Sequence, residues 1–122
     1  MSDYAYEEQF DSMLTIRDRR IRVRYRRGLS EDTAYQTERA RAEEMLRRDT
    51  WYAGYLYRRL AAASIEAWDA RNPDGHPTAI TAAALYLLPI GGLQRVVREA
   101  TGLGIRASAS LTALTTNGAS IP

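Results

Sequence analysis

The four residues Asn72-Pro73-Asp74-Gly75 constrain this chain more than any other stretch of its sequence, because they predict a tight turn at a fixed position. Proline presets φ, an aspartate side chain accepts a hydrogen bond from the backbone that follows it, and glycine adopts the positive φ that closes such a turn. The turn separates an apolar stretch that ends near Trp68 from one that ends at Pro89. We therefore expect an interaction module of two helices and an ordered turn, with no reactive group in it.

Two helices are predicted after the turn. Pro77-Thr78 is typical of a helix start, so we expect a helix over about residues 78–88 with Thr78 as its N-cap. Pro89 ends or kinks this helix, because proline has no N–H group and its ring clashes with the preceding turn of helix. A last helix is expected over about residues 89–101. Its apolar residues recur at i, i+3, i+4 and i+7 as Leu93, Val96, Val97 and Ala100, followed by Gly102 as the expected C′ residue.

Alternating apolar and polar residues near the N-terminus predict a β-hairpin over about residues 13–27. Aliphatic and aromatic side chains at every second position are what a half-buried strand requires. The charged run at residues 17–20 is expected to form the turn, although it lacks the Asn-Gly or Asp-Gly pair that favours a two-residue turn. The alternating apolar residues are Leu14, Ile16, Ile21, Val23 and Tyr25.

Two amphipathic helices are expected between the hairpin and the turn, over about residues 31–48 and 51–71. The first begins with acidic residues, which the helix dipole favours, and has apolar residues on one side. The second has a broad apolar face, which we assign to the core. That face consists of Tyr52, Ala53, Leu56, Tyr57, Leu60, Ala63, Ala67 and Trp68.

The helix predicted over about residues 51–71 also carries a narrower apolar ridge on its opposite side. This ridge consists of Trp51, Tyr55, Ala62 and Ile65, and charged residues flank it. Exposed aromatic area with a polar rim marks interaction sites, so Trp51, Tyr55 and Ile65 are the candidate partner-binding residues. The alternative is that the ridge packs against the hairpin, and the sequence favours neither interpretation.

The chain length and the predicted elements together indicate one small domain of the α+β class that is mostly α-helical. With 122 residues there is room for a single modest core, which we place in residues 1–102, with a flexible tail over residues 103–122. The chain has no cysteine, which excludes disulfides and thiol chemistry. Its first residues are acidic rather than signal-like, and no apolar window is long enough to cross a membrane, so we expect a soluble protein that is not exported.

Residues suited to catalysis or metal binding are few. The one histidine, His76, lies between a glycine and a proline, where a solvated turn residue is the ordinary interpretation. Asp69 and Asp74 flank the turn, but capping and turn hydrogen bonds are the usual role of such residues. No glycine-rich phosphate loop is present. We therefore predict no catalytic residue, no metal ligand and no cofactor.

The basic residues are unusual, because all 17 of them are arginine. Seven arginines fall within residues 17–27, and the hairpin would place Arg22, Arg24 and Arg26 on one face, where they could follow the phosphates of a nucleic acid. The simpler interpretation is an edge strand protected from aggregation by charge. The net charge of +2 does not require a polyanionic partner, so we expect that the chain binds no nucleic acid.

Seven residues around the turn carry a resemblance to a known family, the small tail assembly chaperones of long-tailed bacteriophages. Members of that family have a Trp, an Asp-Gly turn, a Pro-Thr pair and a Leu-Pro pair before a final amphipathic helix. Gly91-Gly92 departs from the pattern, because two glycines weaken the start of that helix. The matching residues are Trp68, Asp74, Gly75, Pro77, Thr78, Leu88 and Pro89.

The resemblance implies a non-enzymatic assembly factor. Such a chaperone binds apolar segments of the tape measure protein, keeps them soluble until the tail tube forms around them, and leaves before the virion is complete. It would act in the host cytoplasm, and the tail tube protein and a longer frameshifted form of the chain itself are further expected partners. The alternative is a small arginine-rich nucleic-acid-binding or virion structural protein.

Overall fold

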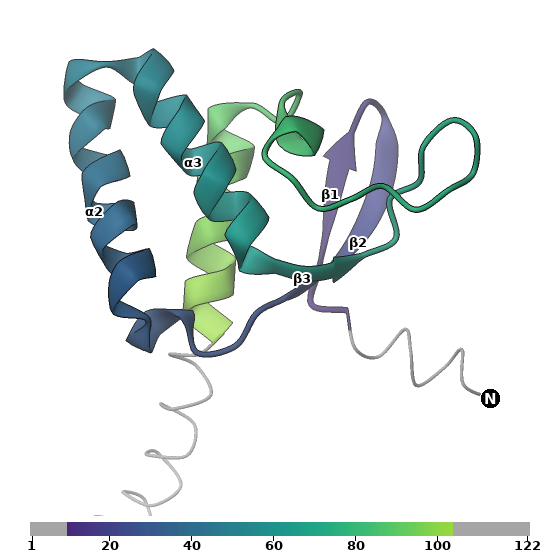
Figure 1. Cartoon of the computed structure of the whole chain (residues 1–122), viewed down its shortest axis with the longest axis horizontal. Coiled ribbons are helices and arrows are strands. Elements are labelled where there is room, and N and C mark those ends of the chain that lie inside the picture. The colour runs from purple at the N-terminus through teal and green to yellow at the C-terminus, as the bar shows by residue number, and fades with distance from the viewer. Residues whose placement is uncertain (1–9, 104–122) are drawn as a thin grey trace, which may run out of the picture.

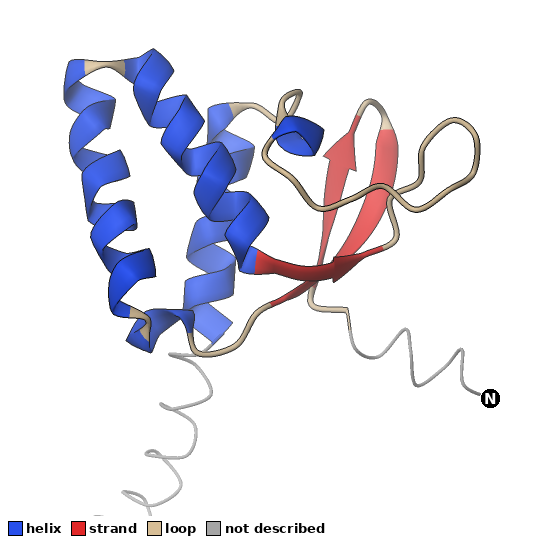
Figure 2. Ribbon diagram, viewed as in Figure 1, coloured by secondary structure: helices blue, strands red, loops and turns tan. Residues whose placement is uncertain are grey.

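The computed structural model describes residues 10–103, which form an α+β fold as the sequence predicts (Figures 1 and 2). A three-stranded antiparallel sheet has the order β1-β2-β3. Its strands are β1 (Ser12–Ile16), β2 (Arg19–Tyr25) and β3 (Ile65–Trp68). The α-helices within the described residues are α2 (Thr33–Arg48), α3 (Thr50–Ser64) and the helix of residues 90–103, with short 3₁₀ turns η1 (Leu29–Glu31) and η2 (Ala83–Leu85).

The predicted hairpin is confirmed, with Leu14 opposite Ile21 and Ser12 opposite Val23. Its turn is shorter than expected, because Arg19 and Arg20 already belong to β2. Arg17 and Asp18 form the turn with φ of 52° and 63°. Positive φ at both central residues matches the right-handed twist of the strands, which is why two-residue hairpin turns adopt it.

The predicted helix over 31–48 is confirmed as α2, and α3 follows it as an antiparallel neighbour (Figure 1). Aspartate caps both helices: Asp32 Oδ1 accepts from the Tyr35 N–H at 3.0 Å, and Asp49 Oδ1 accepts from the Tyr52 N–H at 3.1 Å. A side-chain oxygen at this position satisfies an N–H group that has no partner within the helix.

The prediction of one helix over about residues 51–71 is wrong beyond Ser64. The chain turns there into β3, which pairs with β2 through Tyr25 opposite Ile65 and Val23 opposite Trp68. Pairing with β2 satisfies the backbone hydrogen-bonding groups of both strands. The sequence does not reveal this, because four residues are too few for their apolar pattern to distinguish a helix from a strand. Ser64 is fully buried at the corner, where its hydroxyl donates to Leu60 O at 2.7 Å.

The helix predicted over about residues 78–88 is also wrong, since this segment is irregular apart from η2. Thr78 does not cap a helix. Its N–H donates to Ala70 O at 2.9 Å and its hydroxyl donates to Asn72 Oδ1 at 2.9 Å, so the residue closes the loop before it. The hydrogen bonds back to the loop hold Thr78 in non-helical backbone, and between Thr78 and Pro89 only Ala83–Leu85 form a helical turn.

The turn at residues 72–75 is confirmed in detail. Gly75 has φ of 90°, its N–H donates to Asn72 O at 2.8 Å, and Asp74 Oδ1 accepts from the His76 N–H at 2.9 Å. Arg71 and Pro77 face each other as an isolated bridge across the base. The strong turn chemistry of the sequence therefore acts as expected.

The last helix is confirmed, and its predicted apolar residues Leu93, Val96, Val97 and Ala100 are all buried. Gly102 does not end it as predicted, because it lies within the helix and its φ is not positive. Gly92 has a packing role, since a Cβ there would lie 3.0 Å from Leu88 Cγ and Cδ1. The acidic N-terminal arm up to residue 9 and the tail from residue 104 lie outside the described residues.

The core lies where the sheet, α3 and the helix of residues 90–103 meet (Figure 1). Glu99 joins two of these elements, because its Oε1 accepts from the Ser12 hydroxyl at 2.8 Å and from the Tyr25 hydroxyl at 2.9 Å. The largest fully buried side chains are Tyr25, Leu14, Leu56, Ile65, Leu85 and Leu93.

Candidate interaction surface

Two large aromatic side chains on α3 remain exposed after the core is formed. Trp51 is 77% exposed and Tyr55, one turn later, is 40% exposed. The ring of Tyr55 stacks on that of Tyr52, with centroids 5.9 Å apart and planes 13° apart. We call Trp51, Tyr52 and Tyr55 the α3 aromatic surface. Trp51 and Tyr55 lie on the predicted outer side of this helix, whereas Tyr52, which the sequence assigns to the core face, is only half-buried.

Arginines hold the two tyrosine rings in place. Arg41 on α2 lies over the Tyr52 ring, 5.4 Å from its centroid, and its Nη2 donates to the Tyr52 hydroxyl at 2.8 Å. Arg59 lies over the Tyr55 ring at 5.7 Å. Rings fixed by such contacts lose little freedom when a partner covers them, which lowers the entropic cost of binding.

The predicted ridge does not extend to Ile65, and that part of the prediction is wrong. Ile65 is 1% exposed, because the chain leaves the helix after Ser64 and β3 directs this side chain into the core. Ala62 is half-buried. The exposed part of the ridge is thus its first half, Trp51 and Tyr55.

Two further exposed side chains lie outside the predicted site, and one of them contacts α3. Tyr86 is 68% exposed and Leu87 is 51% exposed, directly after η2. Arg58 on α3 lies over the Tyr86 ring at 5.3 Å and so links these residues to α3. The sequence signal for these exposed residues is the run Tyr86-Leu87-Leu88-Pro89, because four consecutive apolar residues are rarely all buried.

A cavity of about 810 Å³ lies between the hairpin tip, the loop after β3 and the η2 segment. Trp68 forms part of its wall and is half-buried, packed against the core. The Trp68 Nε1–H donates to Thr78 O at 2.8 Å, which fixes the ring. Arg17, Arg19 and Arg71 also line the cavity.

Two of the seven residues of the family resemblance line this cavity, and three more belong to the loop beside it. Trp68 and Thr78 line it, Asp74 and Gly75 form the turn beyond it, and Pro77 bridges to Arg71. Leu88 is 7% exposed in the core, and the exposed Pro89 directly precedes the last helix. The structure therefore brings most of these residues together, in roles of packing and turn formation.

His76 lies on the surface, 79% exposed, with its Nδ1 3.2 Å from Asp74 Oδ2. Within residues 10–103, no three His, Asp or Glu side chains are grouped closely enough to hold a metal ion. In the same part of the chain, no helix combines the length and the apolar character that crossing a membrane requires.

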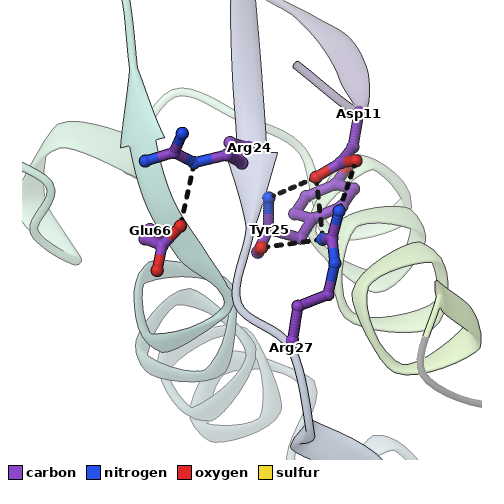
Figure 3. A network of polar contacts seen from close by, with 5 residues as sticks. All are labelled: Asp11, Arg24, Tyr25, Arg27 and Glu66. Carbon is purple, nitrogen blue, oxygen red and sulfur yellow. Dashed lines mark hydrogen bonds and ion pairs between the residues drawn. The ribbon is translucent and has the colours of Figure 1, made fainter. Parts of the chain in front are cut away.

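The arginines of β2 differ in their surroundings. Arg22 Nε lies 2.8 Å from Asp69 Oδ2, and Arg24 Nε lies 2.8 Å from Glu66 Oε2, while Arg26 is exposed. Figure 3 shows the Arg24 pair beside Asp11 and Arg27. Carboxylates of β3 and the residue after it thus offset much of the charge that the hairpin would offer to phosphates.

Asp11 fastens the start of the sheet (Figure 3). Its carboxylate accepts from the Tyr25 N–H at 2.8 Å and from both Arg27 Nη atoms at 3.0 Å. Burial alone would raise the pKa of the Asp11 carboxyl, but these hydrogen bonds and the positive charge of Arg27 together lower it below its ordinary value.

Comparison of the chain with family models, with curated proteins and with solved structures finds no match in any of the three.

Proposed function

We propose that this chain is a tail assembly chaperone, a non-enzymatic protein that binds apolar segments of a phage tape measure protein. The observation that carries the proposal is the α3 aromatic surface, in which Trp51 is 77% exposed on a rigid helix. Together with the resemblance around Trp68 to Pro89, this surface supports a role in binding another protein chain.

The α3 aromatic surface has the features of a binding site for an apolar segment. Exposed aromatic surface is unfavourable in water, so a partner that covers it gains free energy. A ring on a regular helix is already held in place, so covering it immobilises few additional groups. Trp and Tyr are enriched among residues that dominate binding energy, as is Arg, and Arg41 and Arg59 border these rings. An amphipathic helix of the tape measure protein would lie across Trp51 and Tyr55 and remove them from water.

Nucleic-acid binding is supported less well. Arg22 and Arg24 each pair with a carboxylate within the chain, so only part of the predicted arginine row is available to phosphates. A phosphate-binding face gains affinity with each cation that it contributes, and internal pairing reduces that number.

The test is co-expression of the full chain with the tape measure protein encoded by the same phage. We expect soluble tape measure protein that co-purifies with the chain. Trp51→Glu combined with Tyr55→Glu should abolish co-purification, because two charges would face the apolar segment. Thr37→Glu combined with Ala40→Glu is the matched control, since it adds the same charge to exposed positions of α2.

Circular dichroism of both double variants checks that the helices remain. Equal recovery of soluble tape measure protein with and without the chain would refute the proposed function. Retention of binding in the folded Trp51 and Tyr55 variant would move the binding site away from α3.

A further inference from the structure

We infer that the cavity beneath the hairpin tip binds an acidic amphipathic segment of a partner protein. One large apolar side chain of the segment enters the cavity beside Trp68, and neighbouring carboxylates bind Arg17 and Arg19. The inference rests on the proposed function for the presence of a protein partner, and it adds the chemistry of the segment that the partner presents.

The charge of the cavity is one-sided. Arg17, Arg19 and Arg71 line it, and no Asp or Glu occurs among its lining residues in the described part of the chain. The register of the hairpin places Arg19 opposite Ile16, on the face of β2 that also carries Ile21. Guanidinium groups next to apolar surface favour a ligand that combines carboxylates with an apolar side chain.

The two faces of the hairpin differ in how their arginines are satisfied. On the outer face, Arg22 and Arg24 pair with Asp69 and Glu66. At the cavity, Arg71 donates to Gly75 O at 2.9 Å, whereas Arg17 and Arg19 form no ion pair within residues 10–103. Carboxylates of a partner are therefore the natural complement of Arg17 and Arg19 at the cavity.

The two-residue hairpin turn places Arg17 at the cavity. Arg17 and Asp18 have φ of 52° and 63°, a region in which residues other than Gly, Asn and Asp are uncommon. The first position of this turn favours asparagine or glycine, but in this chain it is occupied by Arg17.

A chain segment fits this site better than a small molecule, because the apolar wall of the cavity is itself open to solvent. Tyr86 and Leu87 both line the cavity and are 68% and 51% exposed. Arg58 connects Tyr86 to the outward face of α3. A helix or extended segment can cover this length, whereas a metabolite would leave most of it in water.

The test uses the full chain and a pair of short fluorescein-labelled helical peptides with blocked ends. One peptide carries Leu and Trp along one stripe with Glu on both sides, and the other has Gln in place of every Glu. We expect the Glu peptide to bind about 10-fold more tightly in fluorescence anisotropy at physiological salt. Arg17→Gln combined with Arg19→Gln should remove this preference.

The matched control is Arg20→Gln combined with Arg26→Gln, which removes the same charge from exposed positions in β2 and directly after it. The control should bind the Glu peptide as the parent does. Leu87→Glu is a second variant that needs no change in the hairpin, and it should also weaken binding of the Glu peptide about 10-fold. If the two arginine double variants bind alike, or if the parent does not distinguish the peptides, the inference is overturned.

Two further outcomes separate the inference from the proposed function. If tape measure protein co-purifies while the Arg17 and Arg19 variant keeps full affinity for the Glu peptide, the inference fails and the proposed function stands. If the Glu peptide binds through Arg17 and Arg19 but no tape measure protein is retained, the cavity is supported and the proposed function fails. An oligo-dT strand that displaces the Glu peptide at the same salt would assign these arginines to phosphate and overturn the inference.

Discussion

The two halves of this fold are stabilised by different means. From β1 to α3, regular hydrogen-bonded elements alternate with short connections, and each element follows its own apolar period. From β3 to Pro89, one strand of four residues and one 3₁₀ turn are joined by loop backbone that individual side chains fix in place. The comparison shows that turn chemistry and a few side-chain hydrogen bonds can fix the path of a segment that has little regular structure.

The largest expected loss of stability comes from truncating one core leucine in each half. Leu56 on α3 and Leu85 on η2 are both 0% exposed. Replacing either with Ala removes the same methyl and methylene groups and leaves a cavity, so each variant should lose about 2–5 kcal/mol of unfolding free energy. Urea denaturation of the two variants measures this. A normal midpoint for Leu85→Ala alone would show that the irregular half does not share the core.

The next comparison uses two glycines whose substitution should have opposite effects. Gly75 has φ of 90°, so Gly75→Ala should cost about 1–2 kcal/mol of unfolding free energy even though a Cβ meets nothing within 4 Å. Gly102 lies within the last helix, where Ala is favoured by about 1 kcal/mol, so Gly102→Ala should raise the melting temperature. Destabilisation by Gly102→Ala would restore the predicted helix end at that residue.

These comparisons also show why only part of the fold was predictable from the sequence. The hairpin, α2 and the last helix were predicted correctly because their apolar periods persist over enough residues to distinguish strand from helix. The turn at 72–75 was predicted because its four residues each have a strong local preference. The end of α3 was not predictable, since the identity of residues 65–68 as a strand depends on pairing with β2.

The candidate site was predicted in part for the same reason. Trp51 and Tyr55 were identified because they lie within a true helix, and helical spacing gives their common face. Ile65 was assigned to that face by extending the helix past its end, and the structure buries it. Tyr86, Leu87 and the cavity depend on how a loop folds back on the sheet, which no local pattern in the sequence specifies.

A smaller effect concerns the start of the sheet and its pH dependence. Asp11 has a lowered pKa in the folded chain, so its carboxylate stabilises the fold above the ordinary carboxyl pKa, and this contribution is lost as the pH falls through the lower folded value. Arg27 is largely exposed, so we expect Asp11→Asn to cost only about 1 kcal/mol at neutral pH. Denaturation of parent and variant at pH 6 and in the acid range should show the difference narrowing on acidification. A constant difference would mean that the charge of Asp11 is not the stabilising property.

The smallest effects lie within the turn itself, where they separate the roles of Asp74 and His76. Asp74→Ala removes the acceptor of the His76 N–H and should cost about 1 kcal/mol of unfolding free energy. His76→Ala keeps that N–H and removes only an exposed ring beside an exposed carboxylate, so the change should stay within about 0.5 kcal/mol. Thermal denaturation of both variants at neutral pH makes the comparison. If His76→Ala were the more damaging change, the imidazole ring would have a structural or binding role beyond its contact with Asp74.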